Sequence, residues 1–259
     1  MTSWIRTPFK KVEEKERPFF FQLSDGDTCS QFILYMYAQM YAVSLAKPLF
    51  IYDRGNSVSA NYELLKETFI IAEGVQYTDS IMPASTSLSG RQVSRLLPFL
   101  TPLSVQQIKE AAQKVFQWAP SMLRDIHQNI ANVVVPTNID IGVHLSAVSD
   151  VRSIETYIIG KSKTQNPNIF VASDSPALIA EFSRRSPPSW NVFFLTPVNP
   201  TARPTQRIRV EMYKQFMTEL FLLQSANQVL GSLTTSVGKF LFLTAKNFQS
   251  IDTDVFKFF

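Results

Sequence analysis

Residues 222–239 read LLQSANQVLGSLTTSVGK, and they are the part of the sequence most informative about the fold. It begins at the end of a helix that we expect to run from about residue 209 to residue 225. A short apolar strand follows at residues 228–230, and Gly231 ends it. Small hydroxyl residues then lead into another helix, expected to reach about Lys246. A helix, a buried strand and a second helix in close succession are typical of a parallel α/β sheet.

The same alternation extends upstream from this stretch. We expect further strands at residues 139–144, 169–172 and 192–195, with helices between them. The helix after the second of these strands starts at Asp174-Ser175-Pro176, because a small polar residue caps a helix and proline fits its first turn. The pattern predicts a doubly wound sheet whose strands run parallel.

The first half of the chain repeats the pattern more faintly. A strand at residues 19–23, a helix at 32–45 and a strand at 49–52 make one βαβ unit, which should be right-handed. A short helix is expected at residues 62–65 and a loop at 80–89. We therefore expect an α/β fold of two Rossmann-like domains that face a cleft, with mainly parallel sheets.

The expected boundary between the two domains lies in a helical connection. Ser104-Val105-Gln106-Gln107 is a capping-box pattern that opens a helix, and Pro120 separates it from a second one. We assign residues 1–103 to the N-terminal domain, 104–135 to the connection and 136–259 to the C-terminal domain.

Composition excludes several classes of protein. The 25 basic and 21 acidic residues give a net charge of +4, without the basic run that a nucleic-acid track needs. The single cysteine, Cys29, rules out an internal disulfide and fits a reducing compartment. The longest apolar stretch has 15 residues, fewer than the roughly 20 that span a membrane. No secretory signal precedes it, so we expect a soluble protein of the cytoplasm, or of a virion if the source is viral.

Polar groups stand at the carboxyl ends of three expected strands. They are His144, Asp174 with Ser173, and the hydroxyl run Thr234-Thr235-Ser236, with Lys239 in the first turn of the next helix. Ligands bind at this edge of an open parallel sheet. Free N–H groups, hydroxyls and one cation at a helix start can hold a phosphate. The alternative is that Thr235 or Ser236 merely caps the helix.

These segments resemble a known superfamily of fucosyltransferases, which includes the α1,6-fucosyltransferases, NodZ and the protein O-fucosyltransferases. Residues 139–144 resemble the strand before its His-x-Arg-Arg-x-Asp loop, and residues 169–174 resemble the following strand with its terminal acid. Residues 222–232 resemble its helix, strand and glycine, and residues 234–239 stand where the family has Ser-Ser-Asn-x-x-Arg. Gly26 and Gln31 match a Gly-Gly-x-Gly-Asn-Gln motif at the start of the first domain.

The resemblance implies a two-domain GT-B fold that uses GDP-fucose as donor, without a metal or other cofactor. GDP would bind mainly to the C-terminal domain and a glycan acceptor to the N-terminal one. Asp174 would contact the nucleotide, and His144 would line the donor site. The diphosphate would be held by the loop that carries Thr234, Thr235, Ser236 and Lys239. Asp25-Gly26-Asp27 matches an Asp-x-Asp metal motif of another fold, but without its strand context we expect helix capping there.

The departures from the family concern its cations. After His144 the chain reads LSAVSD (145–150), so both arginines of the loop are absent, and Lys239 replaces a third. These cations neutralise the departing diphosphate, so we expect transfer to be weakened or lost. Four other arginines are candidate substitutes, namely Arg152, Arg184, Arg203 and Arg207. The alternative is an inactive relative that serves as a structural or interaction protein, such as a component of a virion or other large assembly. The high phenylalanine content, 21 residues against 8 glycines, favours this alternative.

Overall fold

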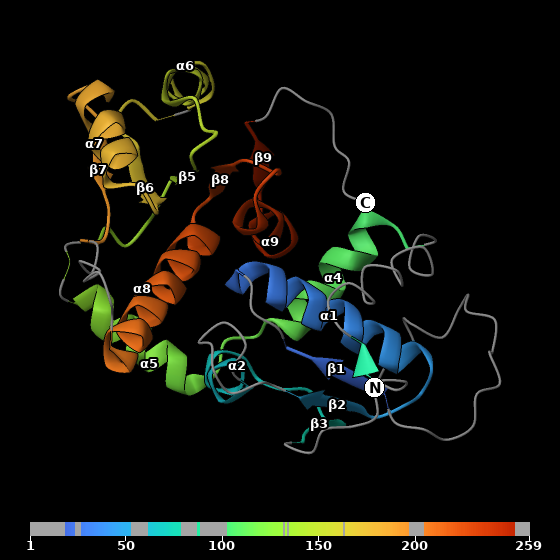
Figure 1. Cartoon of the computed structure of the whole chain (residues 1–259). Coiled ribbons are helices and arrows are strands. Elements are labelled where there is room, and N and C mark those ends of the chain that lie inside the picture. Colours follow the sequence, from blue (N-terminus) through green and yellow to red (C-terminus); the bar gives the residue numbers. More distant parts are fainter. Residues whose placement is uncertain are drawn as a thin grey trace. The chain divides into compact units, whose positions relative to one another are not determined.

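The structure, a computed structural model, describes residues 19–23, 27–52, 62–78, 87–88 (backbone), 103–131, 133, 135–162, 164–196 and 205–251. The chain forms two compact units that divide between Ala119 and Pro120, inside the expected connection. Each unit holds a parallel sheet covered by helices, which confirms the α/β class (Figure 1). The assignment to three parts and the cleft stay predictions.

The first unit is built on a four-stranded sheet of order β3-β2-β1-β4, in which all the pairs are parallel. Helix α1 packs on β1 and β2 and also on α4, so it is buried on most faces, as its nearly uniform apolar sequence predicts. The expected loop at 80–89 is wrong at residues 87–88, which pair with β1; its other residues lie outside the described part. The elements are β1 (Phe19–Gln22), α1 (Thr28–Ser44), β2 (Leu49–Tyr52), α2 (Tyr62–Thr68), β3 (Val75–Tyr77), β4 (Ser87–Leu88) and α4 (Val105–Val115).

Two helix starts in this unit follow the expected capping chemistry. The Asp27 carboxylate accepts hydrogen bonds from the N–H of Ser30 (2.9 Å) and from its hydroxyl (2.5 Å). Asp27 is therefore the N-cap of α1, while Asp25 and Gly26 lie outside the described residues. Ser104 and Gln107 form the expected capping box at the start of α4, and the helix ends at Val115.

The second unit is a five-stranded sheet of order β7-β6-β5-β8-β9 with all strands parallel. The four strands expected from the sequence are present, and β9 is a fifth that the sequence did not predict. Pro176 is the first residue of α7, with Ser175 as its N-cap, as expected. The elements are α5 (Pro120–Ala131), β5 (Ile141–Leu145), α6 (Val151–Lys161), β6 (Asn168–Ser173), α7 (Pro176–Arg185), β7 (Asn191–Phe193), α8 (Gln206–Ser225), β8 (Gln228–Gly231), α9 (Ser236–Thr244) and β9 (Phe248–Ser250).

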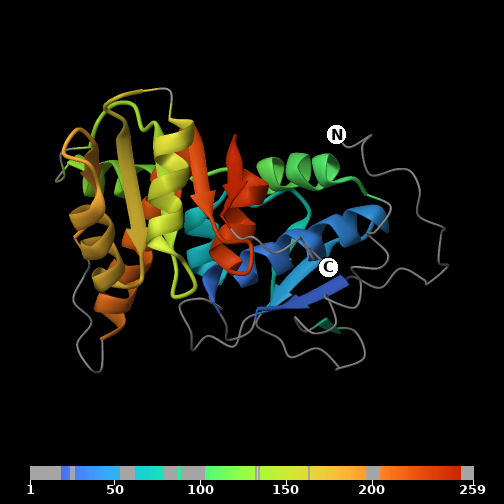
Figure 2. The ribbon, with the colours of Figure 1, turned by 90° about the horizontal axis from the view of Figure 1, so that it is seen from above.

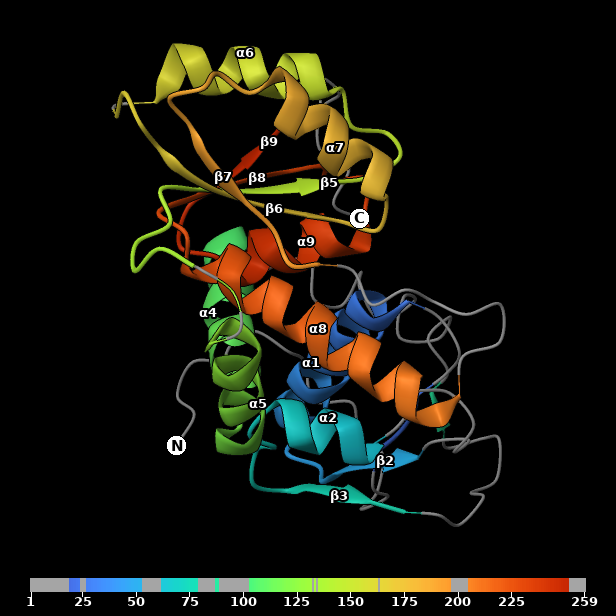
Figure 3. The same cartoon turned by 90° about the vertical axis from the view of Figure 1, so that its left-hand side faces the viewer.

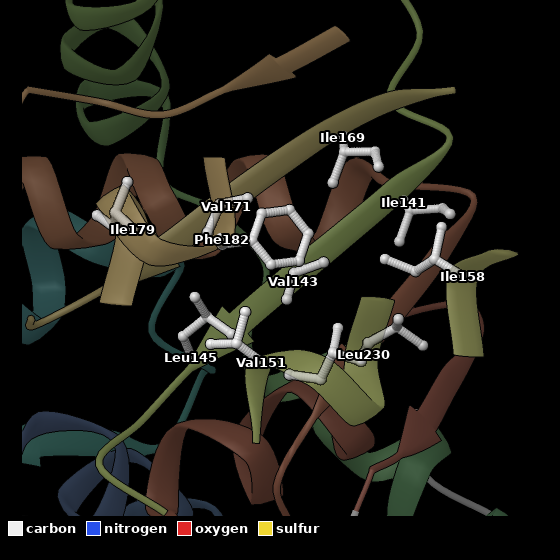
Figure 4. Packing of buried hydrophobic residues seen from close by; sticks show 11 residues of the cluster. Ile141, Val143, Leu145, Val151, Ile158, Ile169, Val171, Ile179, Phe182 and Leu230 are labelled. Carbon is white, nitrogen blue, oxygen red and sulfur yellow. The ribbon is translucent and has the colours of Figure 1, made fainter. Parts of the chain in front are cut away.

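This sheet lies between two helical layers. Helices α6 and α7 cover one face, and α8 and α9 cover the other (Figure 3). Figure 2 shows α6, in yellow, running alongside the strands. Alternate residues of β5, namely Ile141, Val143 and Leu145, pack under α6 and α7 (Figure 4). The residues between them, Gly142 and His144, therefore face α8 and α9.

Helix α8 approaches β5 closely because residue 142 is glycine. A Cβ at Gly142 would lie 3.1 Å from Leu223 Cδ2 and 3.2 Å from Ala226 Cβ. On another side, α8 is joined to α5 by an ion pair between Lys214 and Asp125, 2.7 Å between Nζ and Oδ2. Helix α5 thus packs within the second unit.

Candidate functional site

The chain reverses its direction of travel across the second sheet between β5 and β8. From β5 the chain moves through α6 to β6, whereas from β8 it moves through α9 to β9 on the other side. The loops that follow β5 and β8 therefore separate at the carboxyl edge. In open α/β sheets this switch point is where ligands bind.

His144 and Gly231 lie side by side at this switch point. A Cβ at Gly231 would lie 3.7 Å from the Cβ of His144 and 3.3 Å from the Phe248 ring. The missing side chain at Gly231 thus leaves room for both neighbours. His144 is 9% exposed, and its Nδ1 is buried without a hydrogen-bond partner in the described chain. A buried polar atom of this kind is unusual in a folded protein and calls for an explanation.

The charge state of His144 follows from its surroundings. Burial lowers the pKa of His144 to about 4, and the negative charge of Asp174 acts in the opposite direction. The imidazole is therefore neutral at pH 7. Asp174 is exposed directly after β6, and β6 pairs with β5 so that Ala172 lies opposite His144. The charge of Asp174 thus acts on the His144 ring from the end of the neighbouring strand, while a role of either residue in ligand binding stays a prediction.

The loop after β8 is tied together by its own hydroxyl groups. The Ser232 and Thr234 hydroxyl oxygens lie 2.6 Å apart. The Thr235 hydroxyl donates to the carbonyl of Ser232 (2.9 Å) and accepts from the N–H of Gly238 (3.0 Å). Thr235 is therefore the N-cap of α9, as the capping alternative expected, and phosphate binding by this loop stays a prediction.

Gly238 allows this loop to lie directly on the first turn of α9. A Cβ at Gly238 would come 1.7 Å from the carbonyl oxygen of Ser232, closer than any real contact. The importance of Gly238 was not predicted from the sequence. The signal was present, because glycine is unfavourable inside a helix and the chain holds only 8 glycines.

The start of α9 presents groups that suit a phosphate. The N–H groups of Ser236 and Val237 have no intrahelical partner, as at any helix start, and the Thr234 side chain is exposed. Lys239 is half-buried in the same turn and makes no ion pair with any described residue. Helix-start N–H groups, hydroxyls and one ammonium group are together able to hold an anion.

The loop after β5 contributes no cation to this edge. The N–H of Ser146 donates to the Ser149 hydroxyl (2.9 Å), which closes a tight turn. Asp150 caps α6 by accepting from the N–H of Arg152 (3.1 Å). The turn is thus held by small polar residues, in the place where the resembling family has two arginines.

The four candidate arginines differ in their suitability. Arg152 is exposed at the start of α6, on the carboxyl edge. Arg184 lies in the last turn of α7, at the opposite edge of the sheet, so it cannot replace a loop arginine. Arg207 pairs with Glu211, 3.0 Å between Nε and Oε1, and its side chain is 88% exposed. Arg203 lies outside the described residues.

Solved structures of fucosyltransferases resemble the chain over most of its length. They include fucosyltransferase NodZ from Bradyrhizobium, with a TM-score of 0.64, 14% identity, and coverage of 92% of this chain and 97% of that one. A NodZ α-1,6-fucosyltransferase soaked with GDP-fucose has a TM-score of 0.63 and 13% identity, and the match covers 89% of this chain and 94% of that one. A mutant of FUT1 from Arabidopsis thaliana in complex with GDP has a TM-score of 0.59 and 8% identity, and the match covers 93% of this chain and 71% of that one.

The chain has a fucosyltransferase-like fold. At 8–14% identity these likenesses establish the fold alone. No family model matches the sequence, and no curated protein matches it. Among the described helices, none is long and apolar enough to cross a membrane.

Proposed function

We propose that the chain binds a GDP-sugar at the switch point of its second sheet, and that this sugar donor is GDP-fucose. The observation that carries this proposal is the loop at 232–239, which Gly238 lets fold onto the start of α9 beside His144. The fold adds support, because NodZ and FUT1 structures of the same fold were obtained with GDP-fucose and with GDP.

Each residue of the site has a role in this proposal. The N–H groups of Ser236 and Val237, the Thr234 hydroxyl and the ammonium of Lys239 hold the diphosphate. Thr235 shapes the loop as N-cap, with its hydroxyl already engaged. Asp174 contacts the nucleotide, and His144 lines the donor site. A glycan acceptor, if one is used, binds to the N-terminal part, residues 1–103.

Transfer activity is weak or absent in this proposal. The departing diphosphate must be neutralised, and a positioned donor to such an anion contributes about 2.7–4 kcal/mol. The loop at 145–150 provides no cation, and Lys239 lacks the two-pronged geometry of arginine.

The lack of these cations also favours a second candidate function. A relative without these cations can serve as an interaction or structural protein in an assembly, where no transition-state charge has to be stabilised. We place either protein in the cytoplasm, or in a virion if the source is viral, since its one cysteine, Cys29, cannot form an internal disulfide and so fits a reducing compartment.

Calorimetric titration with GDP, GDP-fucose and a UDP-sugar tests the proposal. GDP and GDP-fucose should bind more tightly than the UDP-sugar, and Lys239→Ala should weaken the binding of both about tenfold or more. The matched control is Lys246→Ala, because Lys246 is exposed just beyond the other end of α9. Absence of binding by all three ligands would leave the interaction protein as the remaining candidate.

A further inference from the structure

The proposed site holds little positive charge for a diphosphate. At the described carboxyl edge, the cations are Lys239 and Arg152, and the carboxylates Asp150 and Asp174 oppose them. A diphosphate brings more than one negative charge, and a helix start contributes only about half a positive charge. A further cation would strengthen binding considerably.

His144 has the position and the free capacity to become that cation. It lies at the switch point, its Cβ 3.7 Å from the Cβ position of Gly231, from which the phosphate loop continues. Its Nδ1 is buried and unpartnered in the described chain, so the described part of the fold does not use the hydrogen-bonding capacity of that nitrogen. The nearby carboxylate of Asp174 already favours a positive ring.

We propose that His144 takes up one proton from the solvent when the diphosphate binds, and that the imidazolium replaces charge missing from the loop at 145–150. This inference rests on the proposed function of the same site. The proton moves from water or buffer to the ring nitrogen that lacks one, the other nitrogen keeps its own, and no other bond changes.

The surrounding charges decide the direction of this coupling. Titratable and charged groups on the elements around His144 include Asp174 after β6, Glu219 on α8, Lys239 on α9, and Asp150 with Arg152 at the start of α6; α8 also carries Arg207, Arg209, Glu211 and Lys214, and α6 carries Glu155 and Lys161. Of these, Asp174 is the one whose charge affects the pKa of His144. Burial keeps the ring neutral in the free protein. A bound diphosphate adds negative charge that, like the charge of Asp174, stabilises the imidazolium and raises the pKa of His144.

The coupling makes ligand affinity depend on pH. Affinity for the diphosphate should rise as the pH falls below the pKa of His144 in the complex. The rise can reach about tenfold per pH unit for one linked proton. It should level off near pH 4, where the ring of the free protein is itself protonated.

Calorimetry with GDP-fucose in two buffers of different ionisation enthalpy, at pH 6 and pH 8, measures the proton uptake directly. GDP-fucose is the suitable probe because its diphosphate is esterified at both ends and does not titrate in this range. At pH 6 the binding enthalpy should differ between the two buffers. The difference, divided by the difference in their ionisation enthalpies, should give an uptake of up to one proton per ligand bound. His144→Gln should abolish the difference, and His127→Gln should keep it, because His127 is the chain's other histidine and lies on α5.

A second measurement covers the case in which His144→Gln does not fold. The two histidines of the unchanged protein give separate imidazole NMR signals, and that of His144 should shift to its protonated position at pH 6 when GDP-fucose is added. Binding with equal heats in both buffers and no such shift overturns the inference and leaves the proposed function standing. Absence of GDP-fucose binding at every pH would contradict both the proposed function and the proton uptake by His144.

Discussion

The carbonyl oxygen of Ser232 occupies the space that a side chain on Gly238 would need, 1.7 Å from the ideal Cβ position. The neighbour is backbone, which cannot rotate away, so either the loop or the start of α9 must move when a methyl group is added. Glycine at residue 238 is therefore what lets the loop at 232–239 lie on the start of α9.

Gly238→Ala should therefore weaken both stability and ligand binding. We expect a loss of about 1–3 kcal/mol in the free energy of unfolding, measured by urea denaturation, because strain from overpacking is of this size. Gly160→Ala is the matched control, since a Cβ there meets nothing within 4 Å in α6. It should stabilise by up to about 1 kcal/mol, as alanine is the better helix former. Equal effects of the two changes would contradict the close contact.

The close packing of α8 on β5 predicts a coupled pair of substitutions. Gly142→Ala should destabilise by about 1–3 kcal/mol, because its methyl group would lie 3.2 Å from that of Ala226. Adding Ala226→Gly removes the opposing methyl group and should recover part of the loss. A double-mutant cycle of urea unfolding measures the coupling. Additive effects would mean that the two positions do not press on each other.

Most of the second sheet could be predicted from the sequence, since its strands are apolar runs separated by helical segments. β9 could not, because Phe248-Gln249-Ser250 has no strand-like alternation; the strand forms where its backbone pairs with the edge of β8. The short strands β3 and β4 have the same explanation, since pairing with a neighbour defines them.

The candidate site divides in a similar way. His144 and Asp174 could be found because each stands where a strand ends, and parallel strands bring those ends to one edge. The environment of His144 could not be predicted, since it includes residues far along the chain, such as Gly231. The same is true of the contact between Ser232 and Gly238.

Glu219 on α8 should make stability depend on pH. Burial raises the pKa of Glu219 to about 7, and a hydrogen bond from Gln215 opposes this shift. The native state therefore binds more protons than the unfolded one between about pH 4.5 and pH 7, so the free energy of unfolding falls as the pH rises through this window. Glu219→Gln should remove this loss and stabilise the protein at pH 8 by about 1–2 kcal/mol.

Urea unfolding at pH 5 and pH 8 checks this effect. Glu211→Gln is the matched control, because Glu211 lies on the same helix with a side chain that is 49% exposed. It should leave the difference between the two pH values unchanged. If Glu219→Gln also leaves it unchanged, the carboxyl group is solvated in solution and does not account for any pH dependence.

The last prediction concerns transfer itself. Release of fucose from GDP-fucose by the unchanged protein, with or without glycan acceptors, should be close to background. Ala147 is exposed and, counted from His144, takes the place of the second arginine in the His-x-Arg-Arg-x-Asp motif of the fucosyltransferases that the sequence resembles, so Ala147→Arg can place a cation there without disturbing the core. Combined with Lys239→Arg, which restores the bidentate geometry, it should raise the rate at least tenfold and at most by the roughly 10²–10³ that one positioned donor contributes.

The neighbouring residue provides the control for this gain. Val148→Arg, combined with Lys239→Arg, adds the same charge one residue further along the same turn, where the side chain is 68% exposed. It should give a smaller gain, because charge stabilises a departing diphosphate only when it is positioned. Equal gains would indicate nonspecific attraction of the donor. Strong turnover by the unchanged protein would contradict the prediction, and its loss in Arg152→Ala would then identify the cation at the start of α6 as the substitute.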